Sequence, residues 1–366
     1  MLRSRDVAFV TSLFLGNTMK TSIIPVFIPH IGCPYRCVFC NQWKITGRQG
    51  LPTSADVAAQ IKAYITENTR DRHWEVAFYG GSFTAIPVAI QEALLTPAKR
   101  ALEAGKIQGI RCSTRPDCID ETVLQRLLAF GVDTVELGVQ SLDDYVLRLA
   151  KRGHTANDVE RATTKLKAWG IRVGHQFMPG LPGETVASLQ YTVAQACALH
   201  CDFARIYPVV VIAGTELAIS YQKGTYTPLS IAEGIRRGAY MKQKLLQARI
   251  PVIRTGLQAT DALSDTTQVL GGAYTPAMGE LIDTYRYRRQ LMAVLARLPQ
   301  GEKITISYHR TDTSRVRGYR NLTVKFCQWR YALDIEWHER EDLPPTCVSV
   351  QTSKREYMLY MDAGSI

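Results

Sequence analysis

The chain has 366 residues, of which 46% are hydrophobic and 21% charged, and its formal net charge at pH 7 is +11. This length allows two domains, or one barrel-like domain with an appendage, and it predicts a sizeable buried core. No apolar stretch approaches the roughly 20 residues that a transmembrane helix needs, so we expect a soluble protein without a membrane partner.

The N-terminus only superficially resembles a secretory signal. Asp6 interrupts its short apolar segment, and no small-x-small cleavage site follows. We expect residues 1–22 to form an extension outside the fold, with Met19 as an alternative start to Met1. The nine cysteines are an odd number and are clustered, unlike a disulfide framework. A reducing, cytoplasmic location is therefore predicted.

Six short apolar runs rich in β-branched and aromatic residues follow in chain order, and helix-like patterns separate them. The runs are 23–28, 75–80, 109–114, 133–140, 171–178 and 203–211. Because a parallel crossover needs the length of chain that a helix supplies, this alternation predicts an α/β fold with a parallel sheet. The sheet either curls into a full or partial barrel or stays doubly wound. In both cases ligands bind at the carboxyl ends of the strands.

The pattern changes in the C-terminal part. The alternation of strands and helices fades after Leu217, and 230–248 is predicted to be one long helix. Three segments, 304–309, 321–329 and 331–338, then alternate apolar and polar residues as strands do. We therefore expect a core at 23–228, a helical extension at 229–298 and a small antiparallel β appendage at 299–366.

Cys33, Cys37 and Cys40 lie in the loop that follows the first predicted strand. Three thiolates so closely spaced can bind one face of a cubane iron–sulfur cluster. A structural zinc site normally has a fourth Cys or His with its own tight spacing, and no such residue is evident. One coordination position is therefore left for a ligand from outside the protein, which is typical of catalytic metal sites.

The C-x-x-x-C-x-x-C run, with Phe39 before its last cysteine, resembles the motif of the radical S-adenosylmethionine (SAM) superfamily. The resemblance implies a partial (β/α)6 TIM-like barrel. It also implies a [4Fe-4S] cluster bound by Cys33, Cys37 and Cys40, whose fourth iron is chelated by SAM. Tyr35 and Phe39, within the motif, are then expected to lie beside the cofactors.

Gly80, Gly81 and Ser82 end the second predicted strand. They resemble the G-G-E-like motif of the superfamily, whose backbone carbonyls receive the methionine ammonium of SAM. Glycines suit this contact because no Cβ obstructs the approach of a ligand to the backbone. Ser82 replaces the acidic residue of that motif. The alternative is an ordinary strand-ending turn.

Two further strand ends carry candidate SAM contacts. The resemblance assigns the end of the fourth predicted strand to the ribose and carboxylate of SAM, and the end of the fifth to its adenine. Glu136 and Gln140 are four residues apart, which predicts one common face of a strand, and Ser141 follows them. A satisfied internal hydrogen-bond network is the alternative. The next strand ends in a double Pro-Gly turn that contains Met178, Gly180 and Leu181, where the alternative is a βα turn capped by Thr185.

Arg115 and Arg152 lie just past the ends of predicted strands, at the expected mouth of the barrel. They are candidates to neutralise the SAM carboxylate or a substrate phosphate. Alternatively, Arg115 pairs with Asp117 or Asp120. His154 and His175 are expected to be core or rim histidines rather than ligands.

Four further stretches resemble the radical SAM half of the Elongator catalytic subunit. They are 113–117, 151–154, 206–217 and 221–226. In that family the radical domain acts on the wobble uridine of tRNA, and an acetyltransferase domain delivers an acetyl group. We identify no Gly-rich pyrophosphate loop after Tyr226, so the same acetyl-dependent chemistry is not expected of this segment.

A basic segment with interleaved aromatic residues points to RNA as a partner. Between Thr284 and Arg330 there are eleven Lys and Arg residues against two acidic residues. The aromatic residues of this segment are Tyr285, Tyr287, Tyr308, Tyr319, Phe326 and Trp329. Cations neutralise phosphates, and aromatic rings stack on unpaired bases. The alternative is a solvated basic face whose aromatic residues belong to the core of the appendage.

The predicted function is reductive cleavage of SAM to a 5′-deoxyadenosyl radical, by a cluster that an electron donor reduces, followed by modification of tRNA or another RNA. One rival is a radical SAM oxidoreductase for a small molecule or tetrapyrrole, similar to the oxygen-independent coproporphyrinogen oxidases. A rival of another class is a non-catalytic iron–sulfur or zinc protein that senses redox state.

Overall fold

The computed structural model describes residues 21–29, 31, 33–41, 50–67, 72–257, 267–331 and 333–362. The expected N-terminal extension and both candidate start residues lie outside these ranges, apart from Thr21 and Ser22. These two residues begin the first strand.

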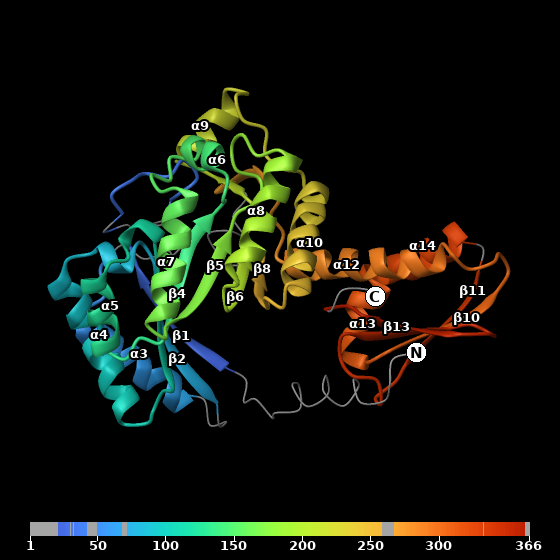
Figure 1. The fold of residues 1–366 in the computed structure, drawn as a ribbon, viewed down its shortest axis with the longest axis horizontal. Helices are drawn as coiled ribbons and strands as arrows, with labels where there is room; N and C mark the ends of the chain where they lie inside the picture. Colours follow the sequence, from blue (N-terminus) through green and yellow to red (C-terminus); the bar gives the residue numbers. More distant parts are fainter. Residues whose placement is uncertain are drawn as a thin grey trace.

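A curled parallel sheet of seven strands, with helices packed along it, makes up the N-terminal part of the described chain (Figure 1). Its strands, in spatial order, are β1 (Thr21–Ile28), β2 (His73–Gly80), β3 (Gly109–Thr114), β4 (Thr134–Gln140), β5 (Arg172–Phe177), β6 (Phe203–Ile206) and β8 (Val252–Thr255). Every neighbouring pair is parallel, so all the carboxyl ends lie at one edge. The expected α/β partial barrel is confirmed.

Helices between the strands pack along the sheet. They are α3 (Ser54–Glu67), α4 (Val88–Glu103), α5 (Glu121–Ala129), α6 (Asp144–Leu149), α7 (Ala156–Ala168), α8 (Val186–Leu199), α9 (Glu216–Gln222) and α10 (Ile231–Gln247). Side-chain caps begin several of them, and the expected cap Thr185 accepts a hydrogen bond from the Ser188 amide at the start of α8. The strands and helices enclose one large apolar core that includes Val76, Phe78 and Leu124.

The seventh strand lies in the segment that was expected to be only helical. β8 follows α10 and pairs in parallel with β6, so the sheet extends beyond residue 228. The sequence interpretation missed β8 because it is a short, half-buried edge strand, V-I-R-T, without a continuous apolar run. The run 203–211 also divides, since the chain leaves β6 and forms β7 (Val210–Ile212), which pairs with β9 (Val269–Gly272).

A second apolar core lies between helix α12 (Met278–Leu295) and a four-stranded sheet (Figure 1). The strands of this sheet are β10 (Lys303–Tyr308), β11 (Asp334–Glu339), β12 (Cys347–Gln351) and β13 (Glu356–Tyr360). The expected antiparallel pairing holds for β10 with β12 and for β12 with β13. The edge pair of β10 and β11 is parallel.

The segment 321–329 was predicted to be a strand, and this prediction is wrong. It lies mostly within α14 (Leu322–Tyr331), preceded by the short helix α13 (Thr313–Arg317). Val324 and Cys327 are buried at helical spacing on α14. The parallel pairing of β10 with β11 explains the helix, because a parallel crossover cannot be made by a tight turn.

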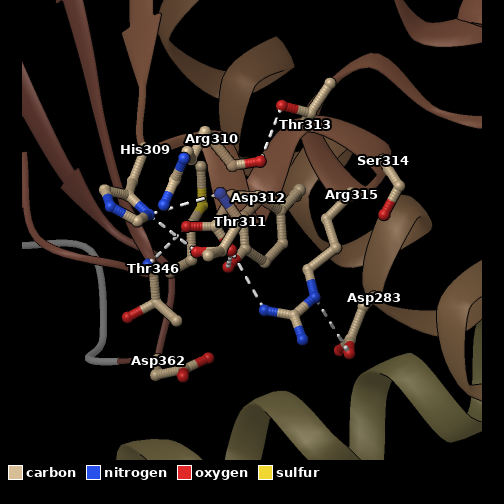
Figure 2. Close-up of polar contacts among 12 residues, drawn as sticks. Asp283, His309, Arg310, Thr311, Asp312, Thr313, Ser314, Arg315, Thr346 and Asp362 are labelled. Carbon is tan, nitrogen blue, oxygen red and sulfur yellow. Dashed lines mark hydrogen bonds and ion pairs between the residues drawn. The ribbon is translucent and has the colours of Figure 1, made fainter. Parts of the chain in front are cut away.

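Two buried acidic residues connect the C-terminal sheet to the helices beside it (Figure 2). The fully buried Asp312 accepts hydrogen bonds from the Thr346 amide (2.6 Å), the Arg315 guanidinium (3.0 Å) and the Tyr287 hydroxyl (3.2 Å). Asp283 on α12 pairs with Lys242 of α10 at 2.7 Å. These charge-assisted contacts orient the sheet on α12 and α12 on α10.

Within the ranges described above, no helix combines the length and the apolar composition needed to cross a lipid bilayer.

Candidate functional site

The cysteine loop after β1 is anchored by backbone hydrogen bonds at the carboxyl edge of the sheet. The Val38 amide donates to the Ala150 carbonyl after α6 (3.2 Å), and the Leu217 amide of α9 donates to the Val38 carbonyl (2.8 Å). Val38, Ala150 and Leu217 belong to one small apolar cluster. Phe39 packs against this cluster, which also includes Met178 and Leu181. Two distant segments of the chain thus hold the loop of Cys33, Cys37 and Cys40 in place.

Arg152 contacts the sulfur of Cys37. One guanidinium nitrogen, Nη1, lies 3.1 Å from Cys37 Sγ, and Nη2 donates to the Gly138 carbonyl at 2.6 Å. Arg152 is buried, so its charge acts on the sulfur with little screening by water. Burial raises the pKa of the neighbouring Cys33 thiol, whereas the Ser82 backbone, Arg115 and Arg152 act to lower it.

Arg115 lies under the ring of Tyr35, with its guanidinium carbon 4.8 Å from the ring centroid. It also donates to Asp117 at 2.9 Å and to the Arg152 carbonyl at 2.5 Å. The expected alternative, a pair with Asp117, is therefore present. The Tyr35 ring packs against Gly153, which has a positive φ of 70°; a Cβ at this position would lie 2.5 Å from the ring, so a side chain there would displace Tyr35 and strain the backbone.

The Gly80-Gly81 turn lies directly against the cysteine loop. Gly80 has a positive φ of 117°, and a Cβ on Gly81 would lie 2.8 Å from the Ile31 carbonyl oxygen. Both positions therefore require glycine. Ser82 is buried, and its hydroxyl contacts Thr114 Oγ1 at 2.8 Å. The Ser82 side chain therefore binds to the end of β3.

Glu136 lies at the centre of a buried polar network inside the curled sheet. Its carboxylate binds the Arg205 guanidinium at 2.7 Å and that of Arg111 at 3.2 Å. Tyr79 and Gln176 also donate to it, at 3.1 and 2.9 Å. Burial raises the pKa of Glu136, but Arg205, Gln176 and Arg111 together bring it below its usual value. The alternative for Glu136, an internal network, is what the structure contains.

Gln140 and Ser141 differ from Glu136 in their surroundings. The register of β4 on β5 shifts between Leu137 and Gln140, and Gln140 has a positive φ of 65°, so simple alternation of faces stops there. The Gln140 side-chain oxygen is buried and has no hydrogen-bond partner within the described residues. Ser141 instead contacts Thr192 of α8 at 3.1 Å. Of these two residues, only Gln140 offers an open acceptor.

Four residues of the Glu136 network were missed at the level of sequence. They are Tyr79, Arg111, Gln176 and Arg205. Each is polar within an apolar strand run, and Arg111 and Arg205 are charged. A charged residue inside such a run indicates a paired interior group, because an unpaired buried charge is too costly.

The double Pro-Gly turn lies beside the cysteine loop. Gly180 has a positive φ of 101°, its amide donates to Glu184 (2.8 Å), and its carbonyl accepts from the Tyr226 hydroxyl (2.7 Å). Gly180 and Leu181 line a cavity of about 420 Å³ together with Val38 of the loop.

His154 and His175 are both buried, as expected for core histidines. Burial is the largest cause that lowers the pKa of each to about 3, so both rings are neutral at pH 7. His175 contacts the Thr163 hydroxyl at 2.9 Å.

The donor groups around the cysteine loop are compatible with an iron–sulfur cluster. Among the residues that the structure describes, no three His, Cys, Asp or Glu side chains are arranged to hold one metal ion. In a cubane, by contrast, each cysteine binds a different iron, so the sulfurs lie farther apart than around one ion. A loop with three thiols, an arginine on one sulfur and the open Gln140 acceptor fits an iron–sulfur cluster with a polar ligand beside it.

Comparison with protein families gives the same result. The model of the radical SAM superfamily matches residues 27–203, and that of the radical SAM C-terminal domain matches residues 201–288. The chain belongs to the radical SAM superfamily. Its expected cofactors, a [4Fe-4S] cluster and SAM, are those of this superfamily.

The expected resemblance to the Elongator catalytic subunit is also confirmed. A tRNA uridine(34) acetyltransferase of Dehalococcoides mccartyi is 30% identical over 56% of this chain and 52% of its own length. The Methanocaldococcus infernus protein of the same name is 28% identical over 74% of this chain and 57% of its own length. The chain thus spans little more than half the length of these relatives. A structure of the M. infernus Elp3, with an N-terminal deletion, has a TM-score of 0.59 at 24% identity, covers 75% of this chain and 64% of that chain, and shares the fold.

Proposed function

We propose that this radical SAM enzyme binds its cluster through Cys33, Cys37 and Cys40 and acts on RNA, with tRNA as the first candidate. The observation that carries the cluster assignment is the anchored cysteine loop, with Arg152 on Cys37 Sγ at 3.1 Å and Gly81 against the loop backbone. When bound and reduced by a separate electron donor, the cluster supplies one electron that cleaves SAM to methionine and a 5′-deoxyadenosyl radical.

The residues around the loop have distinct proposed roles. The carbonyls of Gly80 and Gly81 receive the SAM ammonium group, and Gln140 offers its open acceptor. Arg115 and Arg152 favour bound carboxylate by charge, since both are buried beside the loop. Gly180 and Leu181, with Met178, form the wall proposed for adenine. Glu136 and Ser141 support the site through their own internal contacts.

RNA is proposed as substrate on two grounds. Relatives that match more than half of this chain have names that specify tRNA uridine 34. The basic C-terminal part of the chain adds a surface of matching charge. Because the chain spans about half of those relatives, the proposal is confined to RNA as the substrate class.

The test is anaerobic reconstitution with iron and sulfide, then addition of dithionite and SAM with or without bulk tRNA. We expect 5′-deoxyadenosine in both reactions and more of it with tRNA. Lack of 5′-deoxyadenosine in both would overturn the enzyme proposal and favour a redox sensor. Stimulation by coproporphyrinogen instead of tRNA would favour the tetrapyrrole rival.

Arg152 provides a second prediction, for the Arg152→Met and Arg152→Lys variants. A cation that donates to a cluster sulfur stabilises the reduced state, so its loss is expected to make the midpoint potential more negative by tens of millivolts. The Arg152→Lys variant keeps the charge and is expected to shift less. An EPR-monitored redox titration measures both. Equal potentials in the wild type and in Arg152→Met would contradict this role.

A further inference from the structure

Helix α14 exposes large apolar side chains on its outer face. Its inner face, with Thr323, Val324 and Cys327, is buried in the C-terminal core. Trp329 on the outer face is 78% exposed, and Leu322 is 53% exposed. A tryptophan this exposed gains little from folding, and apolar groups gathered at a surface commonly mark an interaction site.

Cations are interleaved with the aromatic rings on and around α14. No acidic residue occurs between Asp312 and Asp334, whereas Arg320, Lys325 and Arg330 are all exposed there. Within the described residues, none of these three cations has an ion pair. The Arg320 guanidinium lies 5.1 Å from the centroid of the Tyr319 ring, which is 60% exposed.

The ring of Trp329 also has an aromatic neighbour. Phe326, one helical turn earlier, lies 6.0 Å away between ring centroids at an interplanar angle of 56°. The guanidinium carbon of Arg288, on α12, lies 5.5 Å from the centroid of the Phe326 ring. Phe326, itself in contact with Arg288, therefore packs beside the Trp329 ring. Most of the indole surface stays exposed to solvent.

We propose that the outer face of α14, with Lys325, Trp329 and Arg330, and the turn before it, with Tyr319 and Arg320, bind unpaired bases of an RNA. Trp329 and Tyr319 stack on bases, and Arg320, Lys325 and Arg330 contact the phosphates beside them. This inference rests on the proposed RNA substrate and adds where the RNA is held.

The arrangement favours RNA over a membrane surface. A helix that lies in a membrane interface keeps its apolar face for lipid. Val324 and Cys327 of α14 are instead packed into the protein, and the exposed Trp329 lies among the cations Lys325 and Arg330 rather than on a continuous apolar face. Figure 1 shows α14 at the far side of α12 from the seven-stranded sheet, so this surface is separate from the cysteine loop.

The test uses the full chain with reconstituted cluster and three probes: a fluorescein-labelled 12-residue oligouridine, bulk tRNA and phosphatidylserine vesicles. Trp329→Ala is expected to weaken oligouridine binding by about 5- to 100-fold, measured by fluorescence anisotropy, because one stacked base is lost. Trp329→Phe is expected to keep most of the affinity. Tyr191→Ala, which removes a 50%-exposed ring from α8, is the matched control and should bind as the wild type does.

Two further readouts separate stacking from a merely structural effect. Oligouridine is expected to quench the tryptophan fluorescence of the wild type but not that of Trp329→Phe. Lys325→Gln is expected to reduce the slope of log affinity against log salt by about one. Uncoupled production of 5′-deoxyadenosine should be unchanged in all variants, since α14 is distant from the cysteine loop.

Several outcomes would overturn the inference. If Trp329→Ala binds both RNAs as the wild type does, the α14 surface is wrong while the proposed RNA substrate stands. If the wild type binds neither RNA at low salt, the RNA substrate itself fails. If Trp329→Ala loses binding only to phosphatidylserine vesicles, the surface serves a membrane.

Discussion

Cys37→Ser is expected to lose the iron–sulfur absorbance and to reduce the production of 5′-deoxyadenosine to background. The loop then offers two thiolates, and serine is a poor ligand for iron in such clusters. Iron and sulfide content per chain, together with anaerobic SAM cleavage, measures the effect. We expect the fold to persist, because Cys37 is half-buried in a loop and outside the large apolar core.

Cys197→Ser is the matched control for this experiment. Cys197 is half-buried on α8, where its thiol lies 3.6 Å from the Lys244 carbonyl oxygen. Iron content and SAM cleavage should equal those of the wild type. A Cys37→Ser protein with full iron content and undiminished cleavage would show that the cluster is bound elsewhere.

Glu136→Gln is expected to lower the free energy of unfolding by about 3–5 kcal/mol, as for other buried pairs that lose one partner. The amide would keep the shape of the side chain but would direct an NH2 donor at the donors of Arg205 and Arg111. Arg111 keeps its ion pair with Glu75 in this variant, whereas Arg205 loses the carboxylate that neutralises it. Urea unfolding of the two proteins without cluster measures the difference.

The network also predicts a pH dependence. Because the folded-state pKa of Glu136 lies below its usual value, its ionised form stabilises the fold above the unfolded pKa of about 4.3. This contribution is lost as pH falls through the folded pKa, and Glu136→Gln should lack it. Glu103→Gln, which breaks an exposed pair with Lys99, should change stability by less than about 0.5 kcal/mol. A Glu136→Gln protein as stable as this control would contradict the role given to the network.

The composition of the basic segment does not predict which of its aromatic residues are exposed. Tyr287 and Tyr308 were counted with the RNA-binding aromatics, yet both are fully buried in the C-terminal core. Tyr319 and Trp329, from the same group, are exposed. Composition cannot separate the two pairs, because exposure depends on which face of each element meets the second core. For this segment, therefore, the alternative of core aromatic residues holds for Tyr287 and Tyr308, and binding of RNA stays a prediction for the exposed Tyr319 and Trp329.

The sequence by itself determined the six strands that carry the candidate site, the edge at which they end and the cysteine loop. These features depend on short-range patterns: apolar runs of strand length, helix-length crossovers and the spacing of three thiols. Parallel pairing then places every motif at one edge, whatever the detailed packing.

The tertiary structure decided which groups meet across long stretches of chain. Arg152 reaches the Cys37 sulfur from 115 residues away, and Arg205 reaches Glu136 from 69 residues away. It also decided that β8 joins the sheet and that 322–331 is a helix, since a short edge strand and a parallel crossover are defined by their neighbours. Local sequence patterns indicate which residues are apolar. Which side chains contact each other is determined by tertiary packing, and the chemistry of this site depends on those contacts.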